Sequence, residues 1–575
     1  MKTKEQLITF LYGDQGEEVL KRLDLLLEQW NAMIPSRGQV KKKLPLDERD
    51  VIMITYGDSI RKEGEAPLKT MKGFADQWLQ EMVSGIHILP FSPYSSDDGF
   101  SVIDYRKIDP DLGDWDDMSR LGEKFQLMFD VVLNHCSAES EWFKNFLKGD
   151  SKYKNYFHTI DPSTDLSSVF RPRALPLLTE FDTSEGKKHV WTTFSEDQVD
   201  LNFSQPDVFL EFVDIILFYI ARGAKIIRLD AIGFLWKEIG TSCMHHEKTH
   251  AMVQLFRSIL NEAASHVVLL TETNVPYVEN ISYFGEGFNE AHMVYQFTLP
   301  PLTLEAFIRE NATHLTEWAA SLPEINDEHS YFNFMSSHDG IGVLGARGYL
   351  NDDELDHMIE VVKERGGRIS YKATPDGGEM PYEMNINYRD AIVHPDLPLK
   401  LKAMQFVSSQ AVMLCLSGVP GIYIHSLLGS GNWQDGVAES GIKRRINREK
   451  LNSDQLVAEL EEEGSLRQLI YADFKELLKI RRAHKAFDPT SPQYILKLDP
   501  EVFALVRTAY DGSESILCLQ NSSRRRLHMT LDGRNCPLPL RDEFDCLTEG
   551  GSSIEVEDNS WTITLEPYEV MWVKF

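Results

Sequence analysis

Residues 227 to 233, which read IRLDAIG, place an arginine and an aspartate at the end of an apolar segment. Residues i and i+2 of a strand share one face, so Arg228 and Asp230 are expected to point the same way. A charged pair at the end of a buried strand is costly unless it is solvated, paired or functional. Other apolar segments also end in polar or titratable residues, namely Asp130, Asn134, His135, Glu272, His338 and Asp339.

Each of these residues alone has a structural explanation, because an aspartate at a strand end often only caps a helix. As a set they indicate chemistry. Several carboxyl groups, two imidazoles and a guanidinium around one mouth are typical of an active site in which titratable groups share protons and charge. This interpretation requires a fold that brings the ends of these segments together.

Eight short apolar runs recur along the chain and are separated mostly by amphipathic, helix-like segments. They are VIMITY (51–56), GIHILP (85–90), QLMFDVVLN (126–134), AKIIRLD (224–230), VVLLTE (267–272), VYQFTL (294–299), YFNFMSS (331–337) and GIYIHS (421–426). Near-continuous apolar strands that alternate with helices indicate a parallel sheet covered on both faces. The count of eight predicts an α/β protein with a (β/α)8 TIM barrel, and a doubly wound open sheet is the alternative.

Two connections are too long for ordinary loops, and both leave the carboxyl ends of strands, where barrels place their active sites. After residue 490 the pattern changes to short alternating strands, which indicates an antiparallel β domain. We therefore predict a helical extension (1–48), a first barrel part (49–136), a loop subdomain (137–205), a second barrel part (206–488) with an acceptor-loop insertion (340–405), and a C-terminal β domain (489–575).

The composition limits the possible partners. With 59 basic and 89 acidic residues, the net charge of −30 argues against binding to nucleic acid or to an anionic membrane surface. The chain shows no signal-peptide pattern, no apolar run long enough for a membrane span and no CxxC spacing among its six cysteines. A cytoplasmic protein with small-molecule partners is expected, and the oligomeric state cannot be read from the sequence.

Four segments carry a resemblance to a known family. DVVLNH, IIRLDAIGF, LLTETNVP and MSSHDGIGV, in this order and one per expected strand, resemble the four signature regions of the α-amylase superfamily, glycoside hydrolase family 13. GIHILPF, FRPRALP and RRINR extend the resemblance to the sucrose phosphorylase subgroup. The N-terminal extension, the acceptor loop and the segment after the eighth strand look more like the glucosylglycerate phosphorylases of that subgroup.

The resemblance implies a retaining α-glucosyl phosphorylase that works by double displacement. Asp230 would be the nucleophile that forms a β-glucosyl ester, Glu272 the general acid and base, and Asp339 the stabiliser of the transition state. Arg228 would keep the Asp230 carboxylate ionised, because a nearby opposite charge lowers a carboxyl pKa. Asp230 would then act as an ionised nucleophile and Glu272 as a protonated acid.

The same resemblance implies a glucosyl-binding set. Asp97 and Arg444 would grip the sugar ring, His135 and His338 would contact its hydroxyls, and Phe100 would offer it an apolar face. The alternative explanations are a turn aspartate, a surface arginine and a core phenylalanine.

Phosphorolysis further requires groups that hold a phosphate dianion against the carboxylates of the site. The resemblance assigns this role to Arg173 and Tyr382, although the sequence RPR could instead brace its loop. Glycerate as the acceptor would suit an added cation such as Lys372 or Arg368. Phosphorolysis of 2-O-α-glucosylglycerate is the preferred interpretation, and sucrose, sucrose 6′-phosphate and glucosylglycerol remain alternative substrates. Hydrolysis and a non-catalytic binding role compete with phosphorolysis, and no metal or cofactor is expected.

Overall fold

The computed structural model describes residues 2–34, 44–173, 175–373, 378–557 and 559–575. Parts of the predicted helical extension, loop subdomain and acceptor-loop insertion lie outside these residues, so the predicted domain boundaries stay predictions. Among the described residues no helix is long and apolar enough to cross a membrane.

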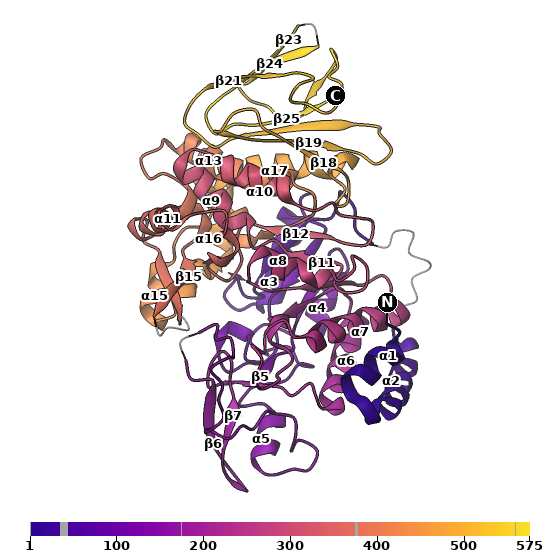
Figure 1. Ribbon diagram of the computed structural model, residues 1–575. Helices are drawn as coiled ribbons and strands as arrows, with labels where there is room; N and C mark the ends of the chain where they lie inside the picture. The colour runs from indigo at the N-terminus through magenta and orange to yellow at the C-terminus, as the bar shows by residue number, and fades with distance from the viewer. Residues whose placement is uncertain (1, 35–43, 174, 374–377, 558) are drawn as a thin grey trace.

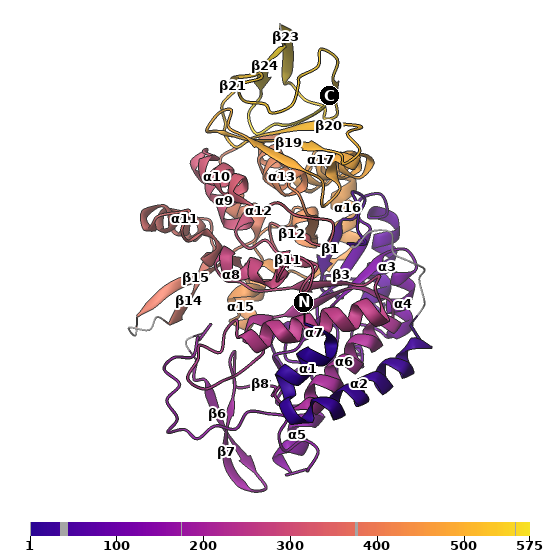
Figure 2. The ribbon, with the colours of Figure 1, turned by 45° about the vertical axis from the view of Figure 1, so that its right-hand side comes forward.

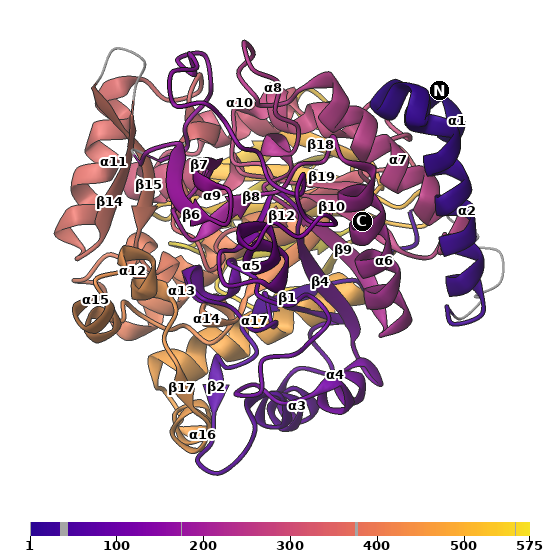
Figure 3. The same cartoon turned by 90° about the horizontal axis from the view of Figure 1, so that it is seen from below.

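Eight parallel strands of the described residues close into a barrel, so the predicted (β/α)8 fold is confirmed and the open sheet is wrong (Figure 3). The pairing runs in chain order around the barrel, and the last strand closes on the first. The strands are β1 (Ile52–Thr55), β3 (Gly85–Ile88), β4 (Gln126–Val132), β9 (Ala224–Asp230), β10 (Val268–Thr271), β11 (Met293–Tyr295), β12 (Ser330–Phe334) and β16 (Val419–Tyr423).

The apolar residues of these strands fill the barrel and contact a ring of amphipathic helices, which explains their near-continuous hydrophobicity. The principal helices are α3 (Pro67–Trp78), α4 (Trp115–Gly122), α6 (Pro206–Ala221), α7 (Glu247–Ala263), α9 (Leu299–Arg309), α10 (Thr313–Ser321), α13 (Leu399–Cys415) and α17 (Leu466–Ala483). Most of the predicted strands end earlier than expected, and 294–299 differs most: it pairs only as far as Tyr295, because Pro300 and Pro301 fit the first turn of α9 and cannot extend a central strand.

The N-terminal residues form α1 (Lys4–Tyr12) and α2 (Gly16–Asn31), which pack on the outside of the barrel against α7 and α6 (Figure 2). Val19, Leu23 and Leu27 form the buried stripe of α2. Lys4 bridges Asp24 at 2.9 Å and Glu262 of α7 at 2.8 Å. These helices cover the outside of the barrel, and none of their residues lines the pocket described below.

Two insertions rise from the carboxyl ends of the strands. The first, after β4, contains the pair β5 (His135–Ser137) and β8 (Gln198–Asp200), α5 (Glu141–Leu147), and the hairpin of β6 (Leu178–Thr183) and β7 (Gly186–Trp191) (Figure 1). The second, after β12, contains α11 (Asp352–Glu364) and a three-stranded sheet of β13 (Ile341–Gly342), β15 (Glu379–Asn385) and β14 (Arg368–Ala373). Both insertions therefore stand over the barrel mouth.

The C-terminal region is antiparallel, as predicted, and lies at the opposite end of the molecule from the β6–β7 hairpin (Figures 1 and 2). One sheet has the order β18 (Gln493–Leu496), β19 (Val502–Thr508), β20 (Ser515–Asn521), β25 (Val570–Lys574) and β22 (Asp545–Cys546). The other has the order β21 (Leu527–Leu531), β24 (Ser560–Leu565) and β23 (Ser553–Glu557).

A buried arginine of α17 connects this helix to the segments that precede the barrel strands β1 and β16. Arg481 is 0% exposed, and its guanidinium donates hydrogen bonds to the backbone carbonyls of Glu48 (2.7 Å), Gly418 (3.1 Å) and Leu414 (3.2 Å). Burial lowers the pKa of Arg481 to about 9. These bonds compensate a cation that would otherwise be buried without a partner.

We predict that Arg481→Ala lowers the free energy of unfolding by about 3 kcal/mol, because it leaves several buried carbonyls without a donor. The neighbouring Arg482 is half-buried and donates to Arg49 and Gln80 carbonyls near the surface, so Arg482→Ala is the matched control with a small effect. Urea denaturation followed by circular dichroism measures both. Equal effects of the two substitutions would contradict this assignment.

Candidate active site

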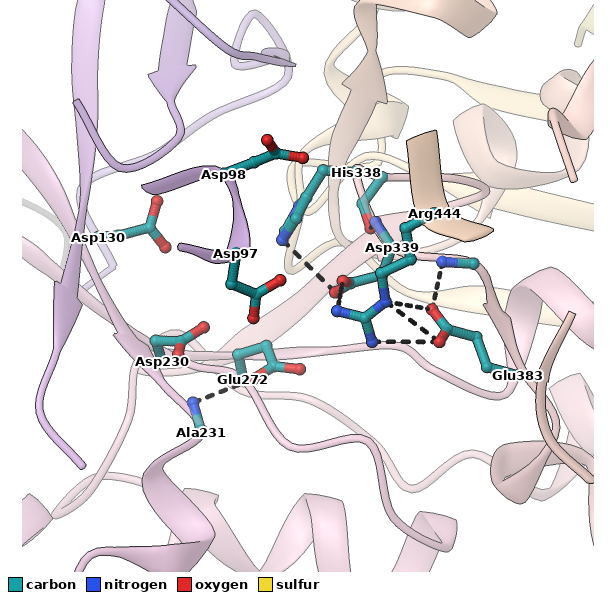
Figure 4. Close-up of polar contacts among 12 residues, drawn as sticks. Asp97, Asp98, Asp130, Asp230, Ala231, Glu272, His338, Asp339, Glu383 and Arg444 are labelled. Atoms are coloured by element: carbon teal, nitrogen blue, oxygen red, sulfur yellow. Dashed lines mark hydrogen bonds and ion pairs between the residues drawn. The ribbon is translucent and has the colours of Figure 1, made fainter. Parts of the chain in front are cut away.

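Most of the predicted site residues meet at the carboxyl end of the barrel, where all except Arg228 and Lys372 line one pocket. Asp230 is the last residue of β9, Glu272 follows β10 directly, and Asp339 lies in the loop after β12 (Figure 4). The parallel register places Arg228 beside Asp130 of β4 and Leu270 of β10. The pocket is lined by Asp97, Phe100, His135, Phe170, Arg173, Asp230, Glu272, Asn274, His338, Asp339, Gly342, Tyr382 and Arg444, among others.

One guanidinium joins three carboxylates at the base of this pocket. Arg228 is 2% exposed and donates hydrogen bonds to Asp130 and to Asp230, the latter at 2.7 Å. A second nitrogen of Arg228 lies 3.8 Å from Glu272. Asp130 also contacts His87, whose Nε2 is 2.6 Å from it. A buried cation that faces several anions is favourable where a single ion pair would barely repay its desolvation.

The three carboxyl groups differ in pKa because they share this cation unequally. Burial opposes ionisation of Asp130, but the charges of Arg228 and His87 lower its pKa to about 2. Burial raises the pKa of Asp230 to about 8; Arg228 opposes this rise, and the Glu272 and Asp130 carboxylates add to it. Burial likewise raises the pKa of Glu272, against the charge of Arg228 and with that of Asp339.

The expectation that Arg228 holds the pKa of Asp230 low is therefore wrong. Desolvation and two neighbouring carboxylates outweigh one guanidinium that is shared with Asp130. The pKa values of both Asp230 and Glu272 are therefore raised, so the two carboxyls retain a proton to higher pH than free carboxyls would. The 2.7 Å hydrogen bond from Arg228 favours Asp230 as the ionised member of the pair.

A second cation organises the opposite wall. Arg444 lies 2.7 Å from Asp339 and 3.1 Å from Glu383 of β15 (Figure 4). Glu383 also accepts a hydrogen bond from the backbone N–H of Gly340. Although burial opposes it, Arg444, together with His338 and Arg448, holds the pKa of Asp339 far below its usual range. Asp339 is therefore ionised throughout the range around neutral pH.

The segment SSDDGF turns two adjacent aspartates in different directions. Asp97 and Asp98 both have left-handed backbone conformations, with φ of 53° and 48°. Asp97 lines the pocket, while Asp98 pairs with Arg445 at 2.9 Å and Arg448 at 2.6 Å. Such strained residues persist only where the surroundings hold them, and here Asp98 anchors the segment that carries Arg444.

Aromatic and imidazole rings form the remaining wall. Phe100 stacks on His338 with ring centroids 4.7 Å apart. His135 lies 2.9 Å from the carbonyl oxygen of Phe100 and 3.1 Å from the side-chain nitrogen of Gln198. Burial lowers the pKa of His135, and it lowers that of His338 to about 3. Both imidazoles are therefore neutral and able to donate and accept hydrogen bonds.

The predicted acceptor residues are only partly brought together. Arg173, 35% exposed, and Tyr382 both line the pocket, and Arg173 lies 3.4 Å from Asp97. Lys372 is not among the lining residues: its Nζ lies 4.9 Å from the ring centre of Phe170, which is. Arg368 donates to the side chain of Gln434 at 2.7 Å, outside the pocket lining.

Glu383 and Lys237 are among the charged residues near the site that sequence reasoning missed. Glu383 follows Tyr382 in β15, and only the pairing of that strand with β13 reveals that it reaches Arg444. Lys237 has its ammonium 2.6 Å from both Asp200 and the Phe234 carbonyl, and it also donates to Asn134. An internal cation thus occupies a cluster of oxygen atoms of the kind that calcium favours.

One other group in the described residues has spacing suited to a metal ion: Glu305, His314 and Glu354, on the outer helices. Arg309 bridges the two carboxylates at 3.1 and 2.5 Å, so a side-chain cation already neutralises them. This group lies outside the pocket.

The pocket combines two buried carboxyls whose pKa values are raised, a third carboxylate that stays ionised, neutral imidazoles and the partly exposed Arg173. Such a constellation is suited to acid-catalysed displacement at a sugar acetal through an oxocarbenium-like transition state.

Comparison with known proteins agrees with this chemistry. Residues 61–359 match the family described as "Alpha amylase, catalytic domain". The chain is 50% identical over 574 residues to a glucosylglycerate phosphorylase of Spirochaeta thermophila, covering 99% of this chain and 97% of the relative. It is 43% identical to a glucosylglycerate phosphorylase of Escherichia coli, with 96% of each chain covered.

Among solved structures, the sucrose 6F-phosphate phosphorylase from Thermoanaerobacter thermosaccharolyticum superposes with a TM-score of 0.71 at 25% identity, over 82% of this chain and 94% of that one. The barrel, the arrangement of strand-end residues and the near-complete coverage of these relatives lead to one conclusion. The chain belongs to the α-amylase family, glycoside hydrolase family 13.

Proposed function

We propose that this enzyme is a retaining α-glucosyl phosphorylase that converts 2-O-α-D-glucosylglycerate and inorganic phosphate into α-D-glucose 1-phosphate and D-glycerate. The observation that carries the proposal is the 50% identity to a glucosylglycerate phosphorylase across almost the whole of both chains. Identity falls to 25% with the sucrose 6F-phosphate phosphorylase, which makes the sucrose-type substrates the second choice.

In the proposed first step the Asp230 carboxylate attacks the anomeric carbon as the bond to glycerate breaks, which gives a β-glucosyl ester. Glu272 donates its proton to the departing glycerate oxygen. Both carboxyls lie next to the guanidinium of Arg228, which supports these two roles. Arg228 can stabilise the Asp230 carboxylate before the attack and the Glu272 carboxylate after the proton has left.

In the proposed second step phosphate attacks the same carbon from the side that glycerate left, and Glu272 takes up a proton from it. Two inversions give an α-configured product, so the anomeric configuration is retained. Asp339, which stays ionised beside Arg444, stabilises the positive charge that develops on the ring in both steps.

The glucosyl unit would be held by groups that already face the pocket. Asp97 and Arg444 contact hydroxyls on the far side of the ring, His135 and His338 donate and accept hydrogen bonds as neutral imidazoles, and Phe100 covers an apolar face. Arg173 and Tyr382, on the two insertions, would bind phosphate in the acceptor half of the pocket. The expected cytoplasmic location stays a prediction.

The substrate assignment is tested by following the release of glucose 1-phosphate from glucosylglycerate, sucrose, sucrose 6′-phosphate and glucosylglycerol at equal phosphate concentration. We expect glucosylglycerate to have the highest kcat/KM by at least about tenfold, since a matched anionic acceptor gains charge-assisted contacts. A higher kcat/KM with a sucrose substrate would reject glycerate as the acceptor. Turnover that does not depend on phosphate would identify a hydrolase.

The nucleophile assignment predicts that Asp230→Asn lowers kcat by about 10⁴-fold or more. The same substitution should leave the protein at least as stable. A raised carboxyl pKa means that ionisation destabilises the folded state as pH rises from the unfolded value through about 8, and the amide removes this cost. Kinetics and thermal denaturation at pH 8 measure both effects. Full activity, or a marked loss of stability, would contradict the assignment.

The raised pKa of Glu272 predicts the alkaline side of the pH profile. Burial raises this pKa, so Glu272 keeps its proton above the usual carboxyl range and loses it as pH rises further, after which it can no longer protonate the glycerate oxygen. kcat/KM for glucosylglycerate should therefore fall about tenfold per pH unit once Glu272 ionises. α-D-Glucosyl fluoride, whose leaving group needs no proton, is the matched control and should show no such fall. The same decline with both substrates would exclude Glu272 as the acid.

A further inference from the structure

His87 is a buried histidine inside the barrel that the proposed mechanism does not use. It lies on β3 and is 0% exposed, and its Nε2 is 2.6 Å from a carboxylate oxygen of Asp130 on β4. Its Nδ1 is also buried and has no hydrogen-bond partner in the part of the chain that the structure describes. Because Asp130 is ionised and can only accept, the ring of His87 donates from Nε2.

The contact continues through Asp130 to the nucleophile. The other oxygen of Asp130 accepts a hydrogen bond from Nη1 of Arg228 on β9, and the same Nη1 donates to Asp230 at 2.7 Å. Four side chains from three adjacent strands, β3, β4 and β9, thus form a continuous line of contacts. Of the four, Asp230 alone lines the pocket among the described residues. His87 can therefore act on the reaction only through Asp130 and Arg228.

Asp130 and Asp230 compete for one nitrogen of Arg228. The bond from His87 satisfies one oxygen of Asp130, so that only the other oxygen draws on the guanidinium. Without His87, a buried anionic oxygen would lack a donor, which is costly. The guanidinium would then gain by turning further toward Asp130, at the expense of its bond to Asp230.

The surroundings leave no second cation to take over. Besides His87, the titratable groups that face these two carboxyls come from several elements: Tyr105, Tyr219 of α6, Arg228 of β9, Glu272 after β10, Tyr295 of β11 and His338 after β12. Burial raises the pKa of the tyrosines and lowers that of His338 to about 3, so these groups are neutral near pH 7. The division of Arg228 between Asp130 and Asp230 therefore governs how readily Asp230 ionises.

We propose that His87 is a positioning residue that holds Asp130 so that Arg228 keeps its bond to the nucleophile Asp230. This inference rests on the proposed function, in which Asp230 attacks the anomeric carbon. His87 acts by donating one hydrogen bond. A side chain that places an N–H where Nε2 lies should therefore replace it, whereas an apolar side chain of similar size should not.

The test compares His87→Leu, which removes the donor, with His87→Gln, whose amide N–H reaches the position of Nε2. His292→Leu is the matched control, because His292 is also a buried imidazole of the barrel, 2% exposed, but its Nδ1 accepts a backbone N–H of Leu269 at 3.0 Å. The measurements are thermal denaturation and kcat/KM for α-D-glucosyl fluoride as a function of pH. This kcat/KM covers only the steps up to the departure of fluoride, which needs no acid.

His87→Leu should lower kcat/KM for the fluoride about 10- to 100-fold near neutral pH. It should also move the acid side of the profile upward by about one pH unit, since Asp230 holds its proton more tightly when Arg228 turns to Asp130. His87→Gln should restore most of the activity and the original profile. His292→Leu should lower the melting temperature without moving the profile. If His87→Leu does not fold, His87→Asn, whose shorter amide does not reach the position of Nε2, should show the same shift.

A double-mutant cycle tests whether His87 acts through Asp130. Asp130→Asn removes the carboxylate that competes for Arg228, and it should move the acid side of the profile to lower pH, because Asp130 contributes to the raised pKa of Asp230. Adding His87→Leu to Asp130→Asn should then have little further effect on kcat/KM, so the two substitutions should not be additive.

The inference is overturned if His87→Leu lowers the melting temperature but leaves the pH profile unchanged, as expected for His292→Leu. Equal losses in His87→Gln and His87→Leu, or additive effects of His87→Leu and Asp130→Asn, would also overturn it. These outcomes are distinguishable from failure of the proposed function. An unmodified enzyme that releases fluoride but forms no glucose 1-phosphate would reject the function, whereas a phosphorylase whose profile does not depend on His87 would reject only this role.

Discussion

The guanidinium of Arg228 is the constraint on which the remaining structure depends. It is buried at the end of β9 and faces the carboxyls of Asp130, Asp230 and Glu272. Without it, three acids could not ionise together in a desolvated barrel end. With it, the pKa of Asp130 is lowered to about 2, while those of Asp230 and Glu272 are raised. A single cation thus sets different protonation states in neighbouring groups, which is what a nucleophile and an acid in one pocket need.

The barrel positions the carboxyl groups, and the two insertions add further residues to the wall of the pocket. Parallel strands deliver side chains to one rim regardless of the loops between them. Phe170 and Arg173 come from the insertion after β4, whereas Tyr382, Glu383 and Lys372 come from the insertion after β12. Glu383 connects this second insertion to the barrel mouth. From β15 it contacts Arg444 and the backbone N–H of Gly340, which is next to Asp339. The insertion after β12 is therefore joined by these contacts to the loop that carries Asp339.

The sequence was sufficient to predict the barrel and its strand-end residues, because apolar periodicity and the polar ends of strands are local signals. It could not give the pKa of Asp230, which depends on burial and on carboxylates far away in the chain. Glu383 and Lys237 escaped notice because their partners are fixed by strand pairing and loop packing. Lys372 lies beside Phe170 at the rim, a placement that depends on the path of a long insertion.

The central claim is that the buried Asp230 carboxylate carries the glucose unit between glycerate and phosphate. It is tested most directly by incubating the Glu272→Gln variant with α-D-glucosyl fluoride, which needs no acid to react, and analysing proteolytic peptides by mass spectrometry. The account predicts one glucosyl group on the peptide that contains Asp230 in the variant, and conversion of the same fluoride and phosphate into α-D-glucose 1-phosphate by the unmodified enzyme. An unmodified Asp230 peptide, or a product of β configuration, would contradict it.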